Sequence, residues 1–259
     1  MIRVKKWIIF YLSILPIFFF FPSCSKPSYP KEKLQEAAKK ILKKEYNLDG
    51  SLKLVGRTLY LEIELPELFS TQKDIPKKVF KKLQGAVLTI VRISLSSDAK
   101  IDTLVTIAKV KDYDFCVRII QRLQDIKDFI YLKISKADYE DRLVFEMLPK
   151  SKINYNDLSI KEFVARLIVS QYNMLLKINP FLGAVLNNMS MEFQSMTNNS
   201  LIIIADSFQP SITDNVKELI QEILVKSYSD VLKKYNVFDF PQSIKIINRN
   251  ENELLTINL

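Results

Sequence analysis

The stretch SIKEFVARLIVSQYNMLLKI, residues 159–178, has apolar residues on most sides of a predicted helix. Ser159 and Glu162 have the spacing of a capping box, in which a serine oxygen and a glutamate carboxylate satisfy backbone donors at a helix start. A helix that is apolar almost all round is buried rather than amphipathic. We therefore predict a central, heavily buried helix here. Its apolar residues are Phe163, Val164, Leu167, Ile168, Val169, Met174, Leu175 and Leu176.

The residues after this helix predict a hairpin, a second helix and a closing hairpin. Residues 189–207 contain two strand-like runs separated by a polar turn at 197–199. Apolar residues at helical spacing predict a helix over 213–236. The last segment, residues 243–259, predicts a hairpin that turns at 249–252.

The first part of the chain shows a similar order. An amphipathic helix is predicted over 32–46, and the segment 51–65 then predicts two strands around a turn at 56–57. Pro76 opens a further helix, because proline suits the first helical position. A strand is predicted over 101–110.

The pattern between these two parts favours a helix over 114–128. It also favours a hairpin with strands at 130–135 and 141–148, which flank the polar turn KADYED at 136–141. The best boundary between the two parts is the segment 149–156, which starts at a proline.

Helix, hairpin, helix and strand thus occur in order in residues 31–111 and again in residues 159–259. This repeated plan predicts an α+β protein, in which antiparallel hairpins and helices form two architecturally similar halves, 32–150 and 151–259. We expect antiparallel sheets covered on one face by helices. The pattern leaves open whether the hairpins join into one sheet or two.

The first residues have the layout of an export signal. Arg3, Lys5 and Lys6 precede an apolar run from Trp7 to Pro22, whose 16 residues are fewer than the roughly 20 that a spanning helix needs. The run ends in Phe21-Pro22-Ser23-Cys24, which resembles the lipobox of bacterial lipoproteins. The alternative is a signal-anchor helix that contains an incidental cysteine.

The lipobox resemblance implies a signal peptide over residues 1–23, cleaved before Cys24. It also implies diacylglycerol on the sulfur of Cys24 and a fatty acyl chain, such as palmitate, on its new amine. Residues 24–31 are then a tether, since two prolines and small polar residues favour extended backbone. The resemblance places the globular part in the bacterial cell envelope, outside the cytoplasm and facing the periplasm. Ser25 favours the outer membrane, if the host has one.

The charge of the chain does not indicate a nucleic-acid partner. Subtracting Arg3, Lys5 and Lys6 from the formal charge of +9 leaves +6 for residues 24–259. Thirty of the 38 basic residues are lysine, whereas sites that grip phosphate more often use arginine, whose planar fork binds two oxygens at once. We therefore expect no nucleic-acid partner.

The residue types present exclude several chemistries. The chain has no histidine, so Ser-His or Cys-His catalysis and imidazole-ligated metals are excluded. Cys116 has no second thiol to pair with once Cys24 carries lipid, and we expect it to be a small core residue on the helix 114–128. Four glycines allow neither a phosphate loop nor a dinucleotide fingerprint. We expect no cofactor, no bound metal and no catalytic residue.

Two enzymatic hypotheses survive these exclusions. Ser97 and Lys100 have the S-x-x-K spacing of serine enzymes that use lysine as the base, although Ser28 and Lys31 show the same spacing. The other hypothesis is a pair of carboxylates for glycoside hydrolysis. Glu62 and Glu64 would fit it, because residues two apart on a strand lie about 6 to 7 Å apart on one face.

Binding functions have other candidates. Tyr113 and Tyr139 lie in acidic, aromatic segments near predicted loops, and tyrosine is enriched at interfaces. The apolar surface of the helix 159–178 could alternatively line a cavity for a lipid chain. The sequence thus predicts a membrane-tethered envelope lipoprotein with a non-catalytic interaction or structural role and an envelope protein as partner. The alternatives are a periplasmic carrier of an apolar ligand and a carboxylate-dependent envelope enzyme.

Overall fold

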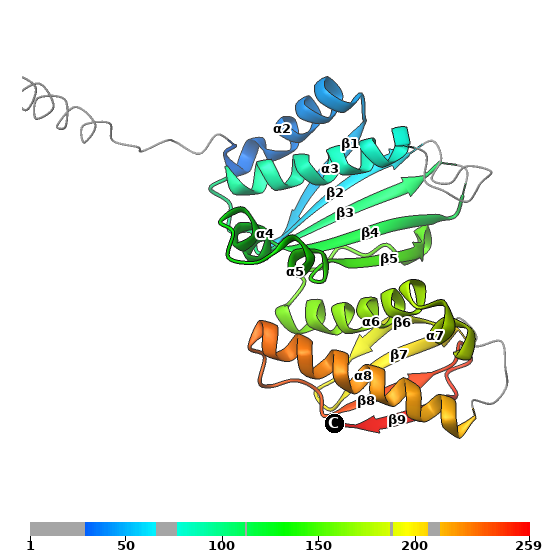
Figure 1. The fold of residues 1–259 in the computed structure, drawn as a ribbon. Helices are drawn as coiled ribbons and strands as arrows, with labels where there is room; N and C mark the ends of the chain where they lie inside the picture. The colour runs from blue at the N-terminus through cyan, green and yellow to red at the C-terminus, as the bar shows by residue number, and fades with distance from the viewer. Residues whose placement is uncertain (1–28, 66–76, 112, 187–188, 207–212) are drawn as a thin grey trace, which may run out of the picture.

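The computed structural model describes residues 29–65, 77–111, 113–186, 189–206 and 213–259, and it is a mixed α+β protein with two separate sheets (Figure 1). The predicted fold class is therefore confirmed, and the hairpins belong to two sheets rather than one. The leader, the lipobox and Cys24 lie outside the described residues, as do Ser28 and Pro76.

The first sheet has five strands, which lie side by side in chain order. Neighbouring strands are antiparallel except for the parallel pair β2 and β3, which α3 (Lys77–Leu95) connects. Such a crossover is needed because two parallel strands cannot be joined by a tight turn. The strands are β1 Gly50–Val55, β2 Thr58–Leu65, β3 Thr103–Val110, β4 Phe115–Arg122 and β5 Val144–Pro149.

The second sheet has four strands, again in chain order. Its central pair, β7 and β8, is parallel and is connected by α8 (Asp214–Tyr235), while the outer pairs are antiparallel. The first four strands of the first sheet show the same pairing sequence, which is compatible with two similar halves. The strands are β6 Ser190–Met196, β7 Ser200–Asp206, β8 Ser243–Ile247 and β9 Glu253–Asn258.

One face of the first sheet is covered by the N-terminal helical segment and by α3 (Figure 1). That segment consists of η1 (Lys31–Lys33), α2 (Leu34–Ile41) and η2 (Leu42–Tyr46), where η2 is a turn of π-helix. It keeps one stripe of apolar residues toward the sheet, as the amphipathic pattern predicts. The buried residues of this stripe are Leu34, Ala38, Ile41 and Leu42.

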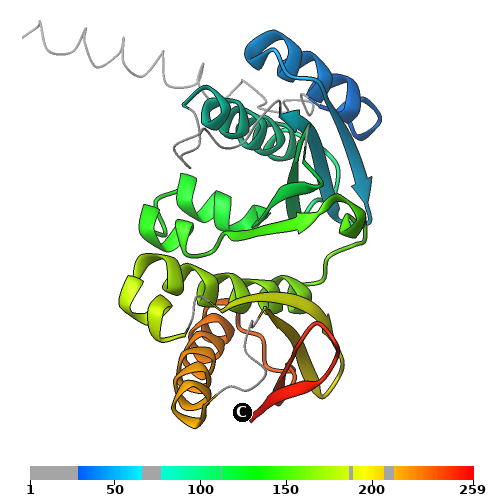
Figure 2. The ribbon, with the colours of Figure 1, turned by 90° about the vertical axis from the view of Figure 1, so that its right-hand side faces the viewer.

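The other face of the first sheet packs on α6 (Ile160–Ile178), which lies between the two sheets (Figure 2). A single hydrophobic core joins this face, α6, α8 and the inner face of the second sheet. Helices therefore cover both faces of the first sheet, not one face as expected. Because α6 touches a sheet on each side, the prediction of a heavily buried helix is confirmed for most of its length, whereas Met174 and Leu175 near its end are exposed. Its fully buried apolar residues are Phe163, Val164, Ala165, Leu167, Ile168 and Tyr172.

Only one of the two hydrogen bonds of the predicted capping box forms at the start of α6. The Ser159 hydroxyl accepts a hydrogen bond from the backbone N–H of Glu162 (3.1 Å), as predicted. The Glu162 carboxylate instead accepts from the Arg166 guanidinium and from the Asn156 amide. The Glu162 carboxylate thus binds the buried Arg166, one turn further along the helix, and not the backbone N–H at the helix start that the motif predicts.

The predictions for residues 114–148 are partly wrong. Of the predicted helix 114–128, residues 115–122 form strand β4 instead, and the remainder belongs to helix α4 (Leu123–Ile130). No strand forms at 130–135, helix α5 (Lys136–Glu140) takes the place of the polar turn, and the strand predicted at 141–148 forms as β5. A strand buried on both faces has an almost continuous apolar run, which periodicity cannot distinguish from a buried helix. Helices cover both faces of this sheet, so β4 is such a strand.

The turn between β1 and β2 contains Gly56 and contacts the segment that precedes α6. Gly56 has a φ of 56°, which suits a residue without a Cβ in a tight two-residue hairpin turn. The Asp157 carboxylate packs against it and accepts hydrogen bonds from the Arg57 N–H (2.8 Å) and the Thr58 hydroxyl (3.1 Å). A Cβ on Gly56 would lie 2.2 Å from an oxygen of Asp157. The turn and the segment before α6 therefore hold each other in place.

Candidate functional site

The candidate site is a groove at the junction of the two halves, where α6 passes between the free edges of β5 and β6. Each of these strands lies at the end of its sheet and, among the residues that the structure describes, has a strand neighbour on one side only. The groove has a volume of about 500 Å³ and is open to solvent, with Phe145 38 % exposed and Met147 48 % exposed. Its apolar lining includes Phe145, Met147, Leu176, Met191, Phe193 and Ile204.

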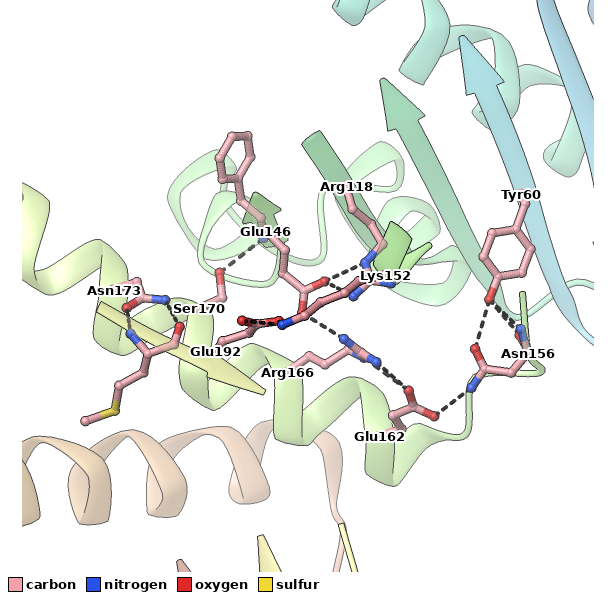
Figure 3. Close-up of polar contacts among 12 residues, drawn as sticks. Tyr60, Arg118, Glu146, Lys152, Asn156, Glu162, Arg166, Ser170, Asn173 and Glu192 are labelled. Atoms are coloured by element: carbon pink, nitrogen blue, oxygen red, sulfur yellow. Dashed lines mark hydrogen bonds and ion pairs between the residues drawn. The ribbon is translucent and has the colours of Figure 1, made fainter. Parts of the chain in front are cut away.

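Side chains of α6 occupy part of each free strand edge (Figure 3). The backbone N–H of Phe145 on β5 donates to the Ser170 hydroxyl (3.1 Å). The Asn173 amide accepts from the backbone N–H of Met191 on β6 (2.9 Å) and donates to the carbonyl of the same residue (2.7 Å). Asn173 thus gives β6 the pair of hydrogen bonds that a neighbouring strand would supply. These contacts hold α6 between the two edges.

A buried network of ion pairs forms one wall of the groove (Figure 3). Glu146 on β5 accepts from Arg118 on β4 (2.6 Å) and from Arg166 on α6 (2.9 Å). Arg166 also donates to Glu162 (2.8 Å), which in turn accepts from the Asn156 amide (3.2 Å). Arg118 and Glu146 are directly opposite each other in the pairing of β4 with β5. The network therefore links the first sheet to α6.

Arg166 is the centre of this network. Burial alone would lower the pKa of its guanidinium, but the carboxylates of Glu146 and Glu162 hold that pKa above its usual value. The guanidinium also lies over the ring of Phe193 on β6, 4.4 Å from its centroid. Because one side chain reaches β5, α6 and β6, Arg166 fixes the walls of the groove relative to each other.

The charged groups of the groove are mostly committed to partners. Glu146 is held by two arginines, and Glu192 on β6 accepts from Lys152 (2.7 Å). Lys177 lies over the ring of Phe145, 5.6 Å from its centroid. The lining contains four cationic and two anionic side chains, which gives a net charge of +2 (four minus two). The groove thus combines apolar lining residues with fixed polar groups and a small positive net charge.

The carboxylates predicted from the alternation of β2 lie elsewhere. Glu62 forms an ion pair with Lys109 on the neighbouring strand, and Glu64 is exposed. Neither residue lines the groove. Ser97 of the S-x-x-K pattern accepts the backbone N–H of Ala99 (3.0 Å), so its hydroxyl caps a local turn. The structure does not bring either predicted enzymatic pair to the groove.

The two tyrosines predicted as interface candidates differ. Tyr113 is 59 % exposed and its ring packs on Phe115 at a centroid distance of 5.5 Å. Tyr139 is packed instead, because its ring stacks on Phe129 (4.8 Å) and its hydroxyl donates to Gln121 (2.6 Å). Burial raises the pKa of Tyr139 to about 12, and the negative charge of Asp125 adds to this effect.

Cys116 is fully buried on β4, so the expected core position is confirmed although the predicted helix is wrong. Burial raises the pKa of its thiol. Among the described residues, no three His, Cys, Asp or Glu side chains gather as a metal would require. In the same part of the chain, no helix combines the length and the hydropathy that crossing a membrane would need.

The ion-pair wall of the groove was not predicted from the sequence, although the sequence contains one signal of it. Arg166 is the only charged residue between Phe163 and Leu176, and it follows Glu162 by four residues, which places both on one side of a helix. A lone arginine in an apolar helix is expected to have a buried carboxylate partner. The second partner, Glu146, could not be inferred, because its position depends on the pairing of β4 with β5.

In comparisons with known proteins, this chain matches no protein-family model, no curated protein and no solved structure.

Proposed function

We propose that this chain is a lipoprotein of the bacterial cell envelope, tethered to the membrane through Cys24, with an interaction role rather than a catalytic one. Its groove between β5, α6 and β6 binds an extended segment of another envelope protein. The lipobox resemblance at residues 21–24 supports the tether. The observation that carries the binding proposal is an open, apolar groove flanked by the free edges of two sheets.

The backbone of the edge strands supports a polypeptide as the ligand. In an antiparallel pair, alternate residues direct both their N–H and C=O groups toward the partner strand or away from it. The N–H of Phe145 points away from β4, since it donates to Ser170. Met147, two residues further along β5, therefore directs its N–H and C=O away from β4 too. The same reasoning applies on β6 to Phe193, two residues after Met191, since the pairing with β7 keeps its register as far as Phe193 and shifts only beyond it.

The side chains of the groove fit the same ligand. Phe145, Met147 and Phe193 offer apolar contacts beside the outward backbone groups of β5 and β6. Recognition by an added strand combines main-chain hydrogen bonds, which give affinity, with pockets for alternate side chains, which give specificity. An extended segment with apolar residues at every second position would satisfy both requirements.

A carrier of an apolar ligand is the second candidate. The volume of about 500 Å³ is within the range of about 300 to 1,000 Å³ that small-molecule sites occupy. The lining has a net positive charge, which would suit an apolar chain that ends in an anionic group. The groove is open rather than enclosed, however, and this favours the polypeptide. A carboxylate-dependent enzyme has less support, since Glu146 and Glu192 are each held by cations.

Site-specific photocrosslinking in living cells tests the proposal. A photoreactive residue replaces Met147 in the groove, and a matched chain carries it at Leu132, which is 87 % exposed on the loop after α4. We expect Met147 to give a discrete adduct that Leu132 does not give, with a peptide of one envelope protein identified by mass spectrometry. A lipid adduct at Met147 would support the carrier instead. The absence of any adduct specific to Met147 would contradict both binding proposals.

A further inference from the structure

A second hollow lies on the other side of the molecule from the groove, between the N-terminal helical segment and α3. It is shallow, with a volume of about 380 Å³, and Tyr29 and Pro30 form one end of it. Its lining residues Lys33, Lys40 and Lys44 recur at a spacing that places them on one face of η1, α2 and η2. The hollow thus presents a lysine stripe that starts where the tether enters the fold.

The charges of this hollow are unbalanced in favour of lysine. Arg92 of α3 is bound to Glu45 through two hydrogen bonds of 2.9 Å, so these two side chains neutralise each other. The remaining lining charges are Lys33, Lys40, Lys44 and one carboxylate, Glu36. The three lysines are exposed, and none of them forms an ion pair with another described residue.

The excess of positive charge is present over the whole helical segment 31–46. Residues 31–46 contain six lysines and three glutamates, a net charge of +3 (six minus three). All six lysines are exposed, and Lys43 is paired with Asp49 on the following loop. The apolar side of the segment is packed on the first sheet, so this charged side faces away from the protein.

The tether limits how far this stripe can be from a lipid at Cys24. The backbone of Tyr29 is fixed to the fold, since its N–H donates to the carbonyl of Ser96 (3.2 Å). Five peptide steps separate Cys24 from Tyr29, and a fully extended chain spans at most about 3.6 Å per residue, or about 18 Å in all. A lipid-anchored chain would therefore keep Lys33 within reach of the headgroup layer.

We infer that the lysine stripe of η1, α2 and η2 docks on the anionic phospholipid headgroups of the membrane that holds the tether. This inference rests on the proposed anchor at Cys24. Lysines near an anionic bilayer each contribute about a fivefold gain in partitioning, and several together hold a surface against it. The three lysines at 33, 40 and 44 share one face, and Glu36 is the one carboxylate of the hollow's lining that Arg92 does not neutralise, so a positive excess remains for such a contact.

Docking through this stripe would orient the whole molecule. The helical segment that carries the stripe and the first sheet lie on one side of α6, and the second sheet lies on the other (Figures 1 and 2). The membrane would face α2, and the groove with its edge strands would be separated from the bilayer by the first sheet. The tether and the stripe thus present the proposed binding groove to the periplasm rather than to lipid.

Lysine reactivity on vesicles tests the docking. The full chain is extracted from the membranes of the expressing bacterium and reconstituted into vesicles of phosphatidylcholine, alone or with about 30 % phosphatidylglycerol. A water-soluble acylating reagent labels the lysines, and mass spectrometry measures each site. We expect Lys33, Lys40 and Lys44 to react about fivefold more slowly on the anionic vesicles, and Lys226 and Lys233 on α8 to be unchanged. Salt at about 1 M should remove the protection, because it screens charges beyond about 3 Å.

A charge-reversal variant provides the second arm. In Lys33→Glu/Lys40→Glu/Lys44→Glu, the neighbouring Lys39 and Lys43 should react equally on both kinds of vesicle. The matched variant Lys217→Glu/Lys226→Glu/Lys233→Glu on α8 should keep the protection of the stripe. Since the stripe side chains are exposed, the first variant should also keep the circular dichroism spectrum of the parent.

Flotation with the vesicles at about 1 M salt separates this inference from the anchor itself, because screening removes charge contacts but not a lipid anchor. A chain that floats while its stripe lysines react equally on both vesicles would overturn the docking and leave the anchor intact. A chain that does not float has no lipid anchor, which would overturn the proposed tether and the docking with it.

Discussion

The replacement Arg166→Ala should destabilise the protein far more than the removal of an exposed ion pair. The Arg166 side chain is 7 % exposed and binds Glu146 and Glu162 at 2.9 and 2.8 Å. Removing one partner of a buried pair costs about 3 to 5 kcal/mol, since the other charge is left buried. Glu146 keeps Arg118 and Glu162 keeps Asn156, so we expect the lower end, about 3 kcal/mol.

Urea unfolding of a chain that begins at Tyr29 measures this loss as a shift in midpoint at constant slope. The matched control is Arg92→Ala, which removes an ion pair with Glu45 whose side chains are 52 % and 39 % exposed. Exposed pairs contribute at most about 1 kcal/mol. Arg166→Lys should fall between the two, because lysine keeps the charge but cannot reach both carboxylates with a planar fork. Equal losses for Arg166→Ala and Arg92→Ala would refute the role given to Arg166.

Three further predictions concern the folded domain. The pKa of Tyr139 is raised to about 12 in the folded protein. Its neutral form therefore stabilises the fold below about pH 10, and this contribution is lost as the pH rises from about 10 to 12. Over that range, Tyr139→Phe should reduce the decline in the free energy of unfolding measured with urea. Gly56→Ala should cost about 1 to 3 kcal/mol, because alanine is strained at positive φ and its Cβ would strike Asp157, and the added Asp157→Ala change should recover part of that loss. The chain from Tyr29 should refold reversibly in reducing, chelating buffer, since its stability comes from burial and hydrogen bonds; unfolding by chelator would indicate a bound cation.

Much of the architecture could be predicted because it depends on local patterns. The helix at 159–178 has apolar residues on most sides, and it is the element that touches both sheets. The hairpins at 51–65, 190–206 and 243–258 have short polar turns between alternating strands, and the structure forms all of them. These elements need no knowledge of distant residues, so periodicity and turn chemistry are sufficient.

The errors arise where distant segments decide the structure. Residues 115–122 form a strand because β3 and β5 pair with it on either side, and their pairing is not encoded in the local pattern. The groove could not be predicted for the same reason. In its wall, Glu146 on β5 binds Arg118 on the paired strand β4 and Arg166 on the helix α6, which packs against the sheet. Only the i, i+4 pair of Glu162 and Arg166 was readable from spacing.

Both the proposed function and the membrane docking depend on the lipid at Cys24, and the N-terminal peptide of the mature protein tests it directly. The protein is extracted from the membranes of the expressing bacterium, digested, and its N-terminal peptide is analysed by mass spectrometry. We expect this peptide to begin at Cys24 and to carry diacylglycerol on sulfur and an acyl chain on the amine. Cys24→Ala should abolish the modified peptide and the incorporation of labelled fatty acid. A peptide that begins at Met1, or an unmodified Cys24, would contradict the account.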